Sequence, residues 1–108
     1  MQKNEPIPEL HIDHVLLDQA AKVLRAVNHP LRQKMLHLLH RSKGTHVTNV
    51  FTTLDLEQSV ASQHLAHLRK AKIVHTERNG REIHYRVHYE RLHQLHLHSK
   101  SLTDGQIK

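Results

Sequence analysis

Short hydrogen-bonding side chains recur in residues 58–72, and their chemistry suits the edges of DNA bases. A glutamine can read adenine through two hydrogen bonds, and a serine can bond to a purine or a pyrimidine edge. Lysine and arginine at the end of the same segment suit phosphates at the border of a groove. The side chains that we expect to contact DNA from this segment are Gln58, Ser59, Ser62, Gln63, His67, Arg69 and Lys70.

Apolar spacing predicts that residues 58–72 form one helix with a single buried side. At 100° per residue, Ala61, Leu65 and Leu68 lie within about 60° of one another. The segment contains no acidic residue, whereas an ordinary surface helix mixes Glu with Lys at four-residue spacing. Because a phosphate-facing surface excludes acidic groups, the pattern favours DNA reading over a plain solvated face. His64 falls between the buried side and the flank, so we expect it to be packed and hydrogen-bonded.

A basic turn follows this helix. Residues 74–78 and 82–87 predict two short strands, and the second alternates apolar with polar residues like a half-buried strand. The Asn-Gly pair at 79–80 between them is typical of a two-residue hairpin loop. Arg78 and Arg81 flank the loop and would bring two cations beside a duplex. A simple solvated turn is the alternative interpretation.

The size and charge of the chain agree with this interpretation. Its 108 residues fit one domain, and a hydrophobic fraction of 37% predicts a thin core that dimerisation would complete. Residues 69–100 hold eight basic and three acidic residues, so they carry five of the six net positive charges. Charge concentrated on the predicted helix and hairpin is typical of phosphate contact. A merely solvated basic surface is again the alternative.

Several other classes of protein are disfavoured. No apolar run approaches the ~20 residues that span a bilayer, and the N-terminus MQKNEPIPEL lacks the form of a signal peptide, so we expect a cytoplasmic protein. The absence of cysteine removes disulfides, thiolate metal sites and thiol redox sensing. The chain has no Gly-rich phosphate loop, nucleophile elbow or obvious carboxylate pair. We therefore expect neither an enzyme nor a bound cofactor.

The expected fold is mainly α: a dimeric winged helix-turn-helix of about five helices with a two-stranded β-hairpin wing. Residues 1–8 should form a flexible arm, residues 9–98 the DNA-binding and dimerisation domain, and residues 99–108 a flexible tail. Gly44 is expected to take the left-handed position that ends the second helix. Apolar spacing and breaker residues predict helices at about residues 9–27, 30–42, 47–54, 58–72 and 89–98.

Four motifs occur in a fixed order between about residues 20 and 89. They are His29-Pro30-Leu31-Arg32 leading into MLHLL, then QSVASQHL at 58–65, then LRKAKIV at 68–74, and Tyr85-Arg86-Val87 after the basic turn. Together they resemble the ArsR/SmtB family of winged-helix repressors. The resemblance implies a homodimer formed by the first and last helices. It also implies binding to an imperfect inverted repeat, with repression relieved by an inducer.

The metal-sensing positions of that family are not matched. Members that sense soft metals carry Cys-x-Cys at the start of the third helix, where this chain has His46 and Thr48. Members that sense zinc, nickel or cobalt often place Asp-x-His early in the last helix, where this chain has Tyr89 and Arg91. Their later His-x2-His pair would fall beyond Lys100, where there is no histidine. The resemblance therefore supports DNA binding better than metal sensing.

Fourteen histidines are several times the ordinary usage for a chain of this length. His11 and His14, and likewise His93 and His96, stand three residues apart, a spacing that can chelate zinc, nickel or copper. One hypothesis is an inducer site for zinc, nickel or cobalt that joins the two pairs across a family-like dimer interface. Two alternatives remain. The histidines could simply occupy polar surface positions, or their protonation below about pH 6.5 could add charge and tune the affinity of the dimer or of DNA binding.

The predicted function is that of a homodimeric DNA-binding transcriptional regulator, a repressor. It would recognise an inverted-repeat operator through the helix at 58–72 and the wing at 78–81, and would respond to an inducer. A winged-helix module whose basic face binds an acidic protein or RNA is the alternative. Salt-sensitive duplex binding, with preference for one palindrome over random sequence, would distinguish the two.

Overall fold

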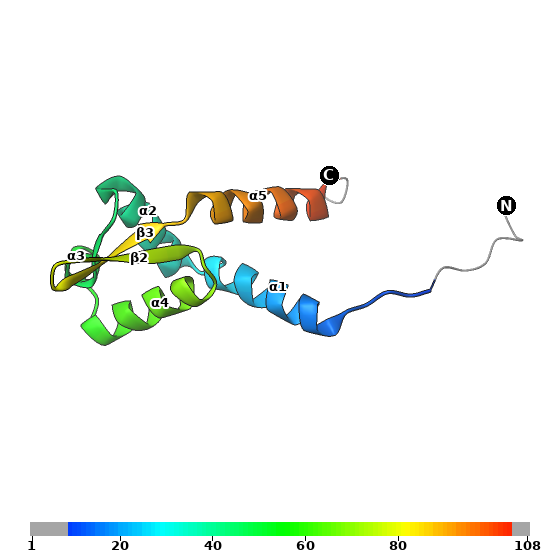
Figure 1. Cartoon of the computed structure of the whole chain (residues 1–108), viewed down its shortest axis with the longest axis horizontal. Coiled ribbons are helices and arrows are strands. Elements are labelled where there is room, and N and C mark those ends of the chain that lie inside the picture. Colours follow the sequence, from blue (N-terminus) through cyan, green and yellow to red (C-terminus); the bar gives the residue numbers. More distant parts are fainter. Residues whose placement is uncertain (1–8, 105–108) are drawn as a thin grey trace, which may run out of the picture.

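The computed structural model describes residues 9–104 and contains five helices and a three-stranded antiparallel sheet in that range (Figure 1). The predicted arm at residues 1–8 lies outside the described residues. The elements follow in the order α1 (His14–Val27), α2 (Pro30–Ser42), β1 (Thr45–His46), α3 (Val47–Thr53), α4 (Gln58–Lys70), β2 (Val74–Asn79), β3 (Glu82–Val87) and α5 (Tyr89–Thr103). The predicted set of helices and the hairpin is confirmed, and the strand order is β1-β3-β2.

The third strand, β1, was not predicted from the sequence. Thr45 pairs with Tyr85 and His46 pairs with His84, so two residues between α2 and α3 extend the hairpin into a sheet. Such a short run cannot show the apolar–polar alternation by which a strand is identified. By pairing with β3, it covers a strand edge that would otherwise expose unpaired backbone groups.

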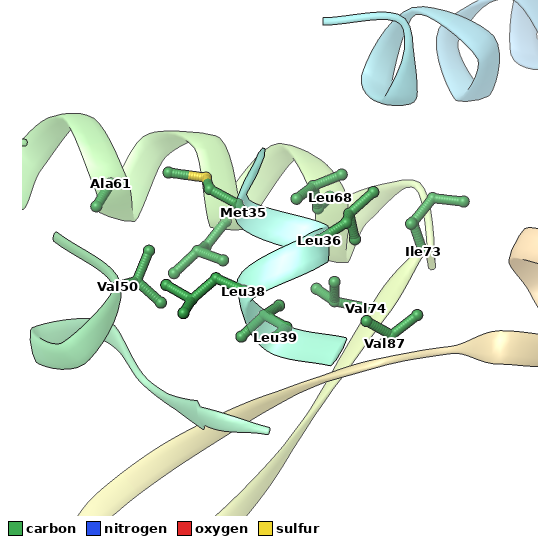
Figure 2. Packing of buried hydrophobic residues seen from close by; sticks show 11 residues of the cluster. Met35, Leu36, Leu38, Leu39, Val50, Ala61, Leu68, Ile73, Val74 and Val87 are labelled. Atoms are coloured by element: carbon green, nitrogen blue, oxygen red, sulfur yellow. The ribbon is translucent and has the colours of Figure 1, made fainter. Parts of the chain in front are cut away.

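The core is built around α2 (Figure 2). Met35 and Leu39 of this helix are 0% and 1% exposed, and they lie among side chains from α3, α4 and the strands. Ala61, Leu65 and Leu68 of α4 are each 0% exposed, as the helical wheel predicted. Burial of a leucine side chain contributes roughly 1.5–3 kcal/mol. The apolar side of α4 is therefore fixed against the core, and its other side faces outward.

Helices α1 and α5 extend from this body and bury little of their own surface (Figure 1). Only Ala26 of α1 is buried, and no residue of α5 is. A cavity of about 270 Å³ separates the two helices. Exposed apolar residues that gather on neighbouring elements are typical of an interaction surface. Those in or next to the two helices are Leu10, Ile12, Val15, Leu16, Leu17, Leu24, Tyr89, Leu97 and Leu102.

Three helices are terminated by a residue in the left-handed conformation that is not glycine. Lys43, Asp55 and Lys72 have φ angles of 59°, 55° and 64°. In each case the amide of the next residue donates to a carbonyl near the end of the helix, at 2.8 or 2.9 Å. The expectation that Gly44 would end α2 in this way was wrong, because Lys43 takes that position. Gly44 is still required, since a Cβ there would lie 2.7 Å from Cγ of Arg86.

The other helix ends also differ from prediction. Helix α1 begins at His14 and not near residue 9, because the Asp13 carboxylate accepts the Leu16 amide at 3.0 Å and caps the helix. Helix α5 continues to Thr103, so residues 99–103, expected in a tail, are helical. The remainder of that predicted tail, from residue 105, lies outside the described residues. No helix between residues 9 and 104 is long and apolar enough to cross a membrane.

Candidate nucleic-acid interface

All nine side chains predicted to contact DNA are exposed. The seven on α4 lie away from the three buried residues of that helix, so their exposure follows from how the helix packs. Helix α4 packs against α3, and a short turn connects the two, which is the arrangement of a helix-turn-helix. Asp55 makes this turn in the left-handed conformation, which Asp tolerates better than most residues. Leu54 and Leu56 on either side of it are half-buried.

The hairpin loop lies one residue further along than predicted. Asn79 pairs with Glu82, so the two loop residues are Gly80 and Arg81 and not Asn79 and Gly80. Gly80 has a φ of 67°, and a glycine at the first loop position is typical of a type II′ hairpin. The prediction of an Asn-Gly loop was therefore wrong. Arg81 occupies the tip itself, and Arg78 lies in the second residue pair below it, opposite Ile83.

The two faces of the hairpin carry different charges. Cross-strand partners share a face of a sheet, so Tyr85 lies on the same face as Thr76, and Arg78 continues that face toward the tip. This face begins at the buried pair Val74 and Val87, beside α4. By the same alternation Glu77 and Glu82 lie on the opposite face. Acidic groups are thus absent from the hairpin face that continues from α4.

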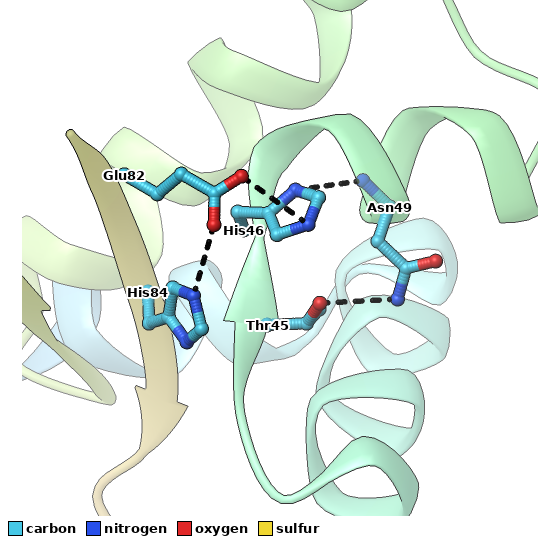
Figure 3. A network of polar contacts seen from close by, with 5 residues as sticks. All are labelled: Thr45, His46, Asn49, Glu82 and His84. Atoms are coloured by element: carbon cyan, nitrogen blue, oxygen red, sulfur yellow. Dashed lines mark hydrogen bonds and ion pairs between the residues drawn. The ribbon is translucent and has the colours of Figure 1, made fainter. Parts of the chain in front are cut away.

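On that opposite face the carboxylates have basic partners. Glu77 Oε1 lies 3.0 Å from Arg86 Nε. Figure 3 shows the Glu82 carboxylate between two imidazoles, with Oε1 3.4 Å from His84 Nε2 and Oε2 3.8 Å from His46 Nε2. The other nitrogen of His46 accepts the Asn49 amide at 3.4 Å and caps α3. This network joins β1, β3 and α3, and together with the separate Glu77–Arg86 pair it engages both acidic residues of the hairpin.

The basic residues on the α4 side are not paired in this way. Between residues 9 and 104, Arg69, Lys70, Arg78 and Arg81 take part in none of the ion pairs. An open groove of about 420 Å³ lies between α4 and the hairpin. Its lining residues are Ala66, His67, Arg69, Lys70 and Tyr85. Four cations without a carboxylate partner, beside an open groove, can bind an extended polyanion.

Tyr85 is a site residue that the sequence analysis missed. Its alternation with charged neighbours identified it only as a half-buried strand residue, and it is half-buried in the structure. Its position in the groove with Arg69 and Lys70 adds an aromatic ring and a hydroxyl to that surface. The available signal was its place in the strand that follows the basic turn.

His64 is packed and hydrogen-bonded, as predicted. Its Nδ1 accepts a hydrogen bond from Arg32 Nε at 3.1 Å, and its ring meets that of His29 edge-on at a centroid distance of 4.8 Å. Burial, then the charge of Arg32, and then His29 and His67 lower the pKa of His64 below its usual 6.5. The imidazole is therefore neutral at pH 7, with its lone pair on the nitrogen that faces Arg32.

The histidines proposed for an inducer site all lie on the surface. His11, His14, His93 and His96 are exposed, and the rings of the last two stack at a centroid distance of 6.4 Å. Within residues 9–104 of one chain, no group of three or more His, Cys, Asp or Glu is arranged to hold a metal ion. A site that joins two chains stays a prediction.

Comparison with known proteins places these features among transcriptional regulators. No protein-family model matches the chain. The transcriptional repressor PagR of Bacillus anthracis is 36% identical over 76 residues, which span 70% of this chain and 76% of PagR. The repressor SmtB of Mycobacterium tuberculosis is 38% identical over 72 residues, which span 67% of this chain and 53% of SmtB.

Two solved structures show the same fold. The crystal structure of PagR aligns with a TM-score of 0.63 at 31% identity and covers 79% of this chain and 98% of that one. A homodimeric winged helix-turn-helix DNA-binding domain from Mycobacterium bovis aligns with a TM-score of 0.70. It covers 95% of this chain and 94% of its own at 24% identity, so it shows the fold alone.

Proposed function

The chain belongs to the ArsR/SmtB family of winged helix-turn-helix transcriptional repressors, and we propose that it represses transcription as a homodimer bound to duplex DNA. One observation carries this proposal: α4 and one hairpin face border a common groove, and together they carry exposed hydrogen-bonding side chains and unpaired cations with no acidic group among them. A duplex offers base edges and phosphates to such a surface.

In the proposed complex α4 enters a major groove. Its base-facing side chains would be Gln58, Ser59, Ser62, Gln63 and His67. Arg69 and Lys70, near the C-terminal end of α4, would bind phosphates at the groove border. Arg78 and Arg81 would hold the adjacent backbone or minor groove from the hairpin. Tyr85 lines the groove with Arg69 and Lys70 and lies on the hairpin face of Arg78, so it would contact the same strand.

The dimer would be formed by α1 and α5, whose apolar residues find little cover within one chain. A two-fold axis between the subunits presents two copies of α4 in opposite directions, and these match two half-sites of an inverted repeat. The proposed inducer site would lie at this interface, because His11 and His14 belong to or precede α1, while His93 and His96 lie on α5. Calorimetric titration with zinc, using His93→Ala/His96→Ala as the control, checks that site.

Salt dependence of duplex binding tests the proposal. Each phosphate contact that is lost should reduce the slope of log K against log salt by about 0.9. We therefore expect a smaller slope for Lys70→Met or Arg78→Met, but not for Arg41→Met, an exposed residue at the end of α2. Equal slopes for all three variants would contradict the assigned surface. Binding to RNA or to an acidic protein, with no preference for one palindrome over a random duplex, would support the alternative interaction module.

A further inference from the structure

Arg32 of α2 is half-buried and forms hydrogen bonds to two other helices. Its Nη1 donates to the carbonyl of Ala26 in the last turn of α1 at 3.3 Å. Its Nε donates to Nδ1 of His64 on α4 at 3.1 Å. One guanidinium thus connects the end of α1 with the middle of α4. Because its donors form a rigid planar fork, it fixes the direction of both contacts.

This link constrains α4 in a way that the core does not. The buried residues Ala61, Leu65 and Leu68 press α4 against the core through apolar contacts, which have no preferred direction. A hydrogen bond has a preferred direction. At His64 it acts on the flank of the helix, so it opposes rotation of α4 about its own axis. Rotation would turn the neighbouring Gln63 away from a base edge.

The link depends on the protonation state of His64. A neutral imidazole can accept from Arg32, whereas a protonated one carries hydrogen on both nitrogens and is repelled by the guanidinium. The groups that face His64 are Arg32 from α2, His29 from the α1–α2 connection and His67 from α4 itself. The ring of His29 packs edge-on against that of His64, and its own Nδ1 is enclosed with no hydrogen-bond partner among the described residues.

We propose that Arg32 is a positioning residue for operator recognition, which holds α4 in its DNA-reading orientation through neutral His64, and that protonation of His64 releases this hold. The proposal rests on the proposed DNA-binding function and adds a regulation to it. Because the pKa of His64 is lowered from 6.5, the link is intact at pH 7 and is lost only as the pH falls through that lowered pKa. Acid should therefore weaken sequence reading, although added positive charge alone would strengthen attraction to phosphates.

The experiment compares the affinity of the full chain for two duplexes of equal length. One is the segment upstream of its own gene that footprinting identifies, and the other has a random sequence. Arg32→Met removes the donor but keeps the aliphatic length. We expect it to lower the ratio of specific to random affinity about tenfold, because that fold-change corresponds to the free energy that a hydrogen bond to a charged group contributes. Arg41→Met removes the same charge from an exposed position of α2 and should leave that ratio unchanged.

His64 is tested by two substitutions. His64→Leu removes the acceptor, and we expect it to lower the ratio as Arg32→Met does, with no further loss in the double variant because both remove the same contact. His64→Asn keeps an acceptor atom at the position of Nδ1 and cannot titrate, so its ratio should stay near that of the wild type at pH 7.5. Thermal unfolding of each variant confirms that binding is measured on folded protein.

A pH series distinguishes the positioning of α4 through His64 from a general loss of protein stability in acid. Between pH 7.5 and the lowest pH at which both proteins stay folded, the ratio should fall for the wild type and stay constant for His64→Asn. Superimposable curves would overturn the role of His64 protonation. A wild-type ratio in Arg32→Met would overturn the positioning role while leaving the proposed function intact. Failure of the wild type to bind either duplex would overturn the proposed function and this inference together.

Discussion

At the scale of single residues, histidine acts as a hydrogen-bond acceptor at three structural positions. His64 accepts from Arg32, whereas His46 and His88 accept backbone amides at the first turns of α3 and α5. The last two occupy N-cap positions, where Ser, Thr, Asp and Asn are more usual. Part of the histidine excess is thus structural. None of this follows from the count of fourteen, because spacing in the sequence does not show which nitrogen meets which donor.

The cap at His88 gives a prediction at this scale. Its Nδ1 accepts the Arg91 amide at 3.1 Å, so His88→Ala should lower the free energy of unfolding by about 1 kcal/mol. His88→Asp should restore it, because aspartate caps well and its charge favours a helix N-terminus. Urea denaturation at constant protein concentration measures both. His98→Ala, at an exposed position of the same helix, is the control. Equal stabilities for His88→Ala and the control would disprove the cap.

At the scale of elements, apolar periodicity correctly predicted those features that are determined by packing against the core. It identified the buried side of α4 and both hairpin strands, because burial selects residues at the period of the element. It missed the loop register, because that depends on cross-strand packing. Val74 and Val87 are 2% and 5% exposed and face each other. Fixing that buried pair places the loop at residues 80–81, against the local preference of Asn-Gly.

The end of α4 gives a prediction at the scale of elements. Lys72 has a φ of 64°, a conformation that costs a residue with a side chain roughly 1–2 kcal/mol. Lys72→Gly should therefore raise the free energy of unfolding by about 0.5–1 kcal/mol, after allowance for the greater freedom of glycine in the unfolded chain. Lys72→Ala removes the same charge and should give no such gain. If Lys72→Gly is no more stable than Lys72→Ala in the same urea titration, the left-handed end of α4 at Lys72 is contradicted.

At the scale of the whole molecule, the chain separates two surfaces. The basic surface of α4 and the hairpin lies at one end of the molecule. Helices α1 and α5, which carry the exposed apolar residues, extend away from that end (Figure 1). The nine predicted DNA contacts could be chosen from the sequence because they belong to one helix and one turn. The groove at Tyr85 could not, since it forms only when the folded hairpin packs against α4 and brings Tyr85 to that helix.

The apolar surface gives a prediction about assembly. Leu102 is 72% exposed and lies beside the cavity between α1 and α5. Because its side chain contributes little within one chain, Leu102→Glu should leave the monomer folded. A buried unpaired carboxylate should weaken the proposed dimer at least about tenfold. Sedimentation equilibrium measures this, with Ser101→Glu, also exposed, as the matched charge control. An unchanged dimer in Leu102→Glu would exclude this end of α5 from the interface.

The central claim is that α4 and the adjoining hairpin face bind a specific duplex site, and hydroxyl-radical footprinting on the DNA upstream of the protein's own gene tests it most directly. The account predicts two protected half-sites related by an inverted repeat, with centres about 34–36 Å or a multiple of this distance apart. Gln63→Ala/Lys70→Ala should abolish the protection. Unprotected DNA with wild-type protein at low salt, or a footprint unchanged in that variant, would contradict the account.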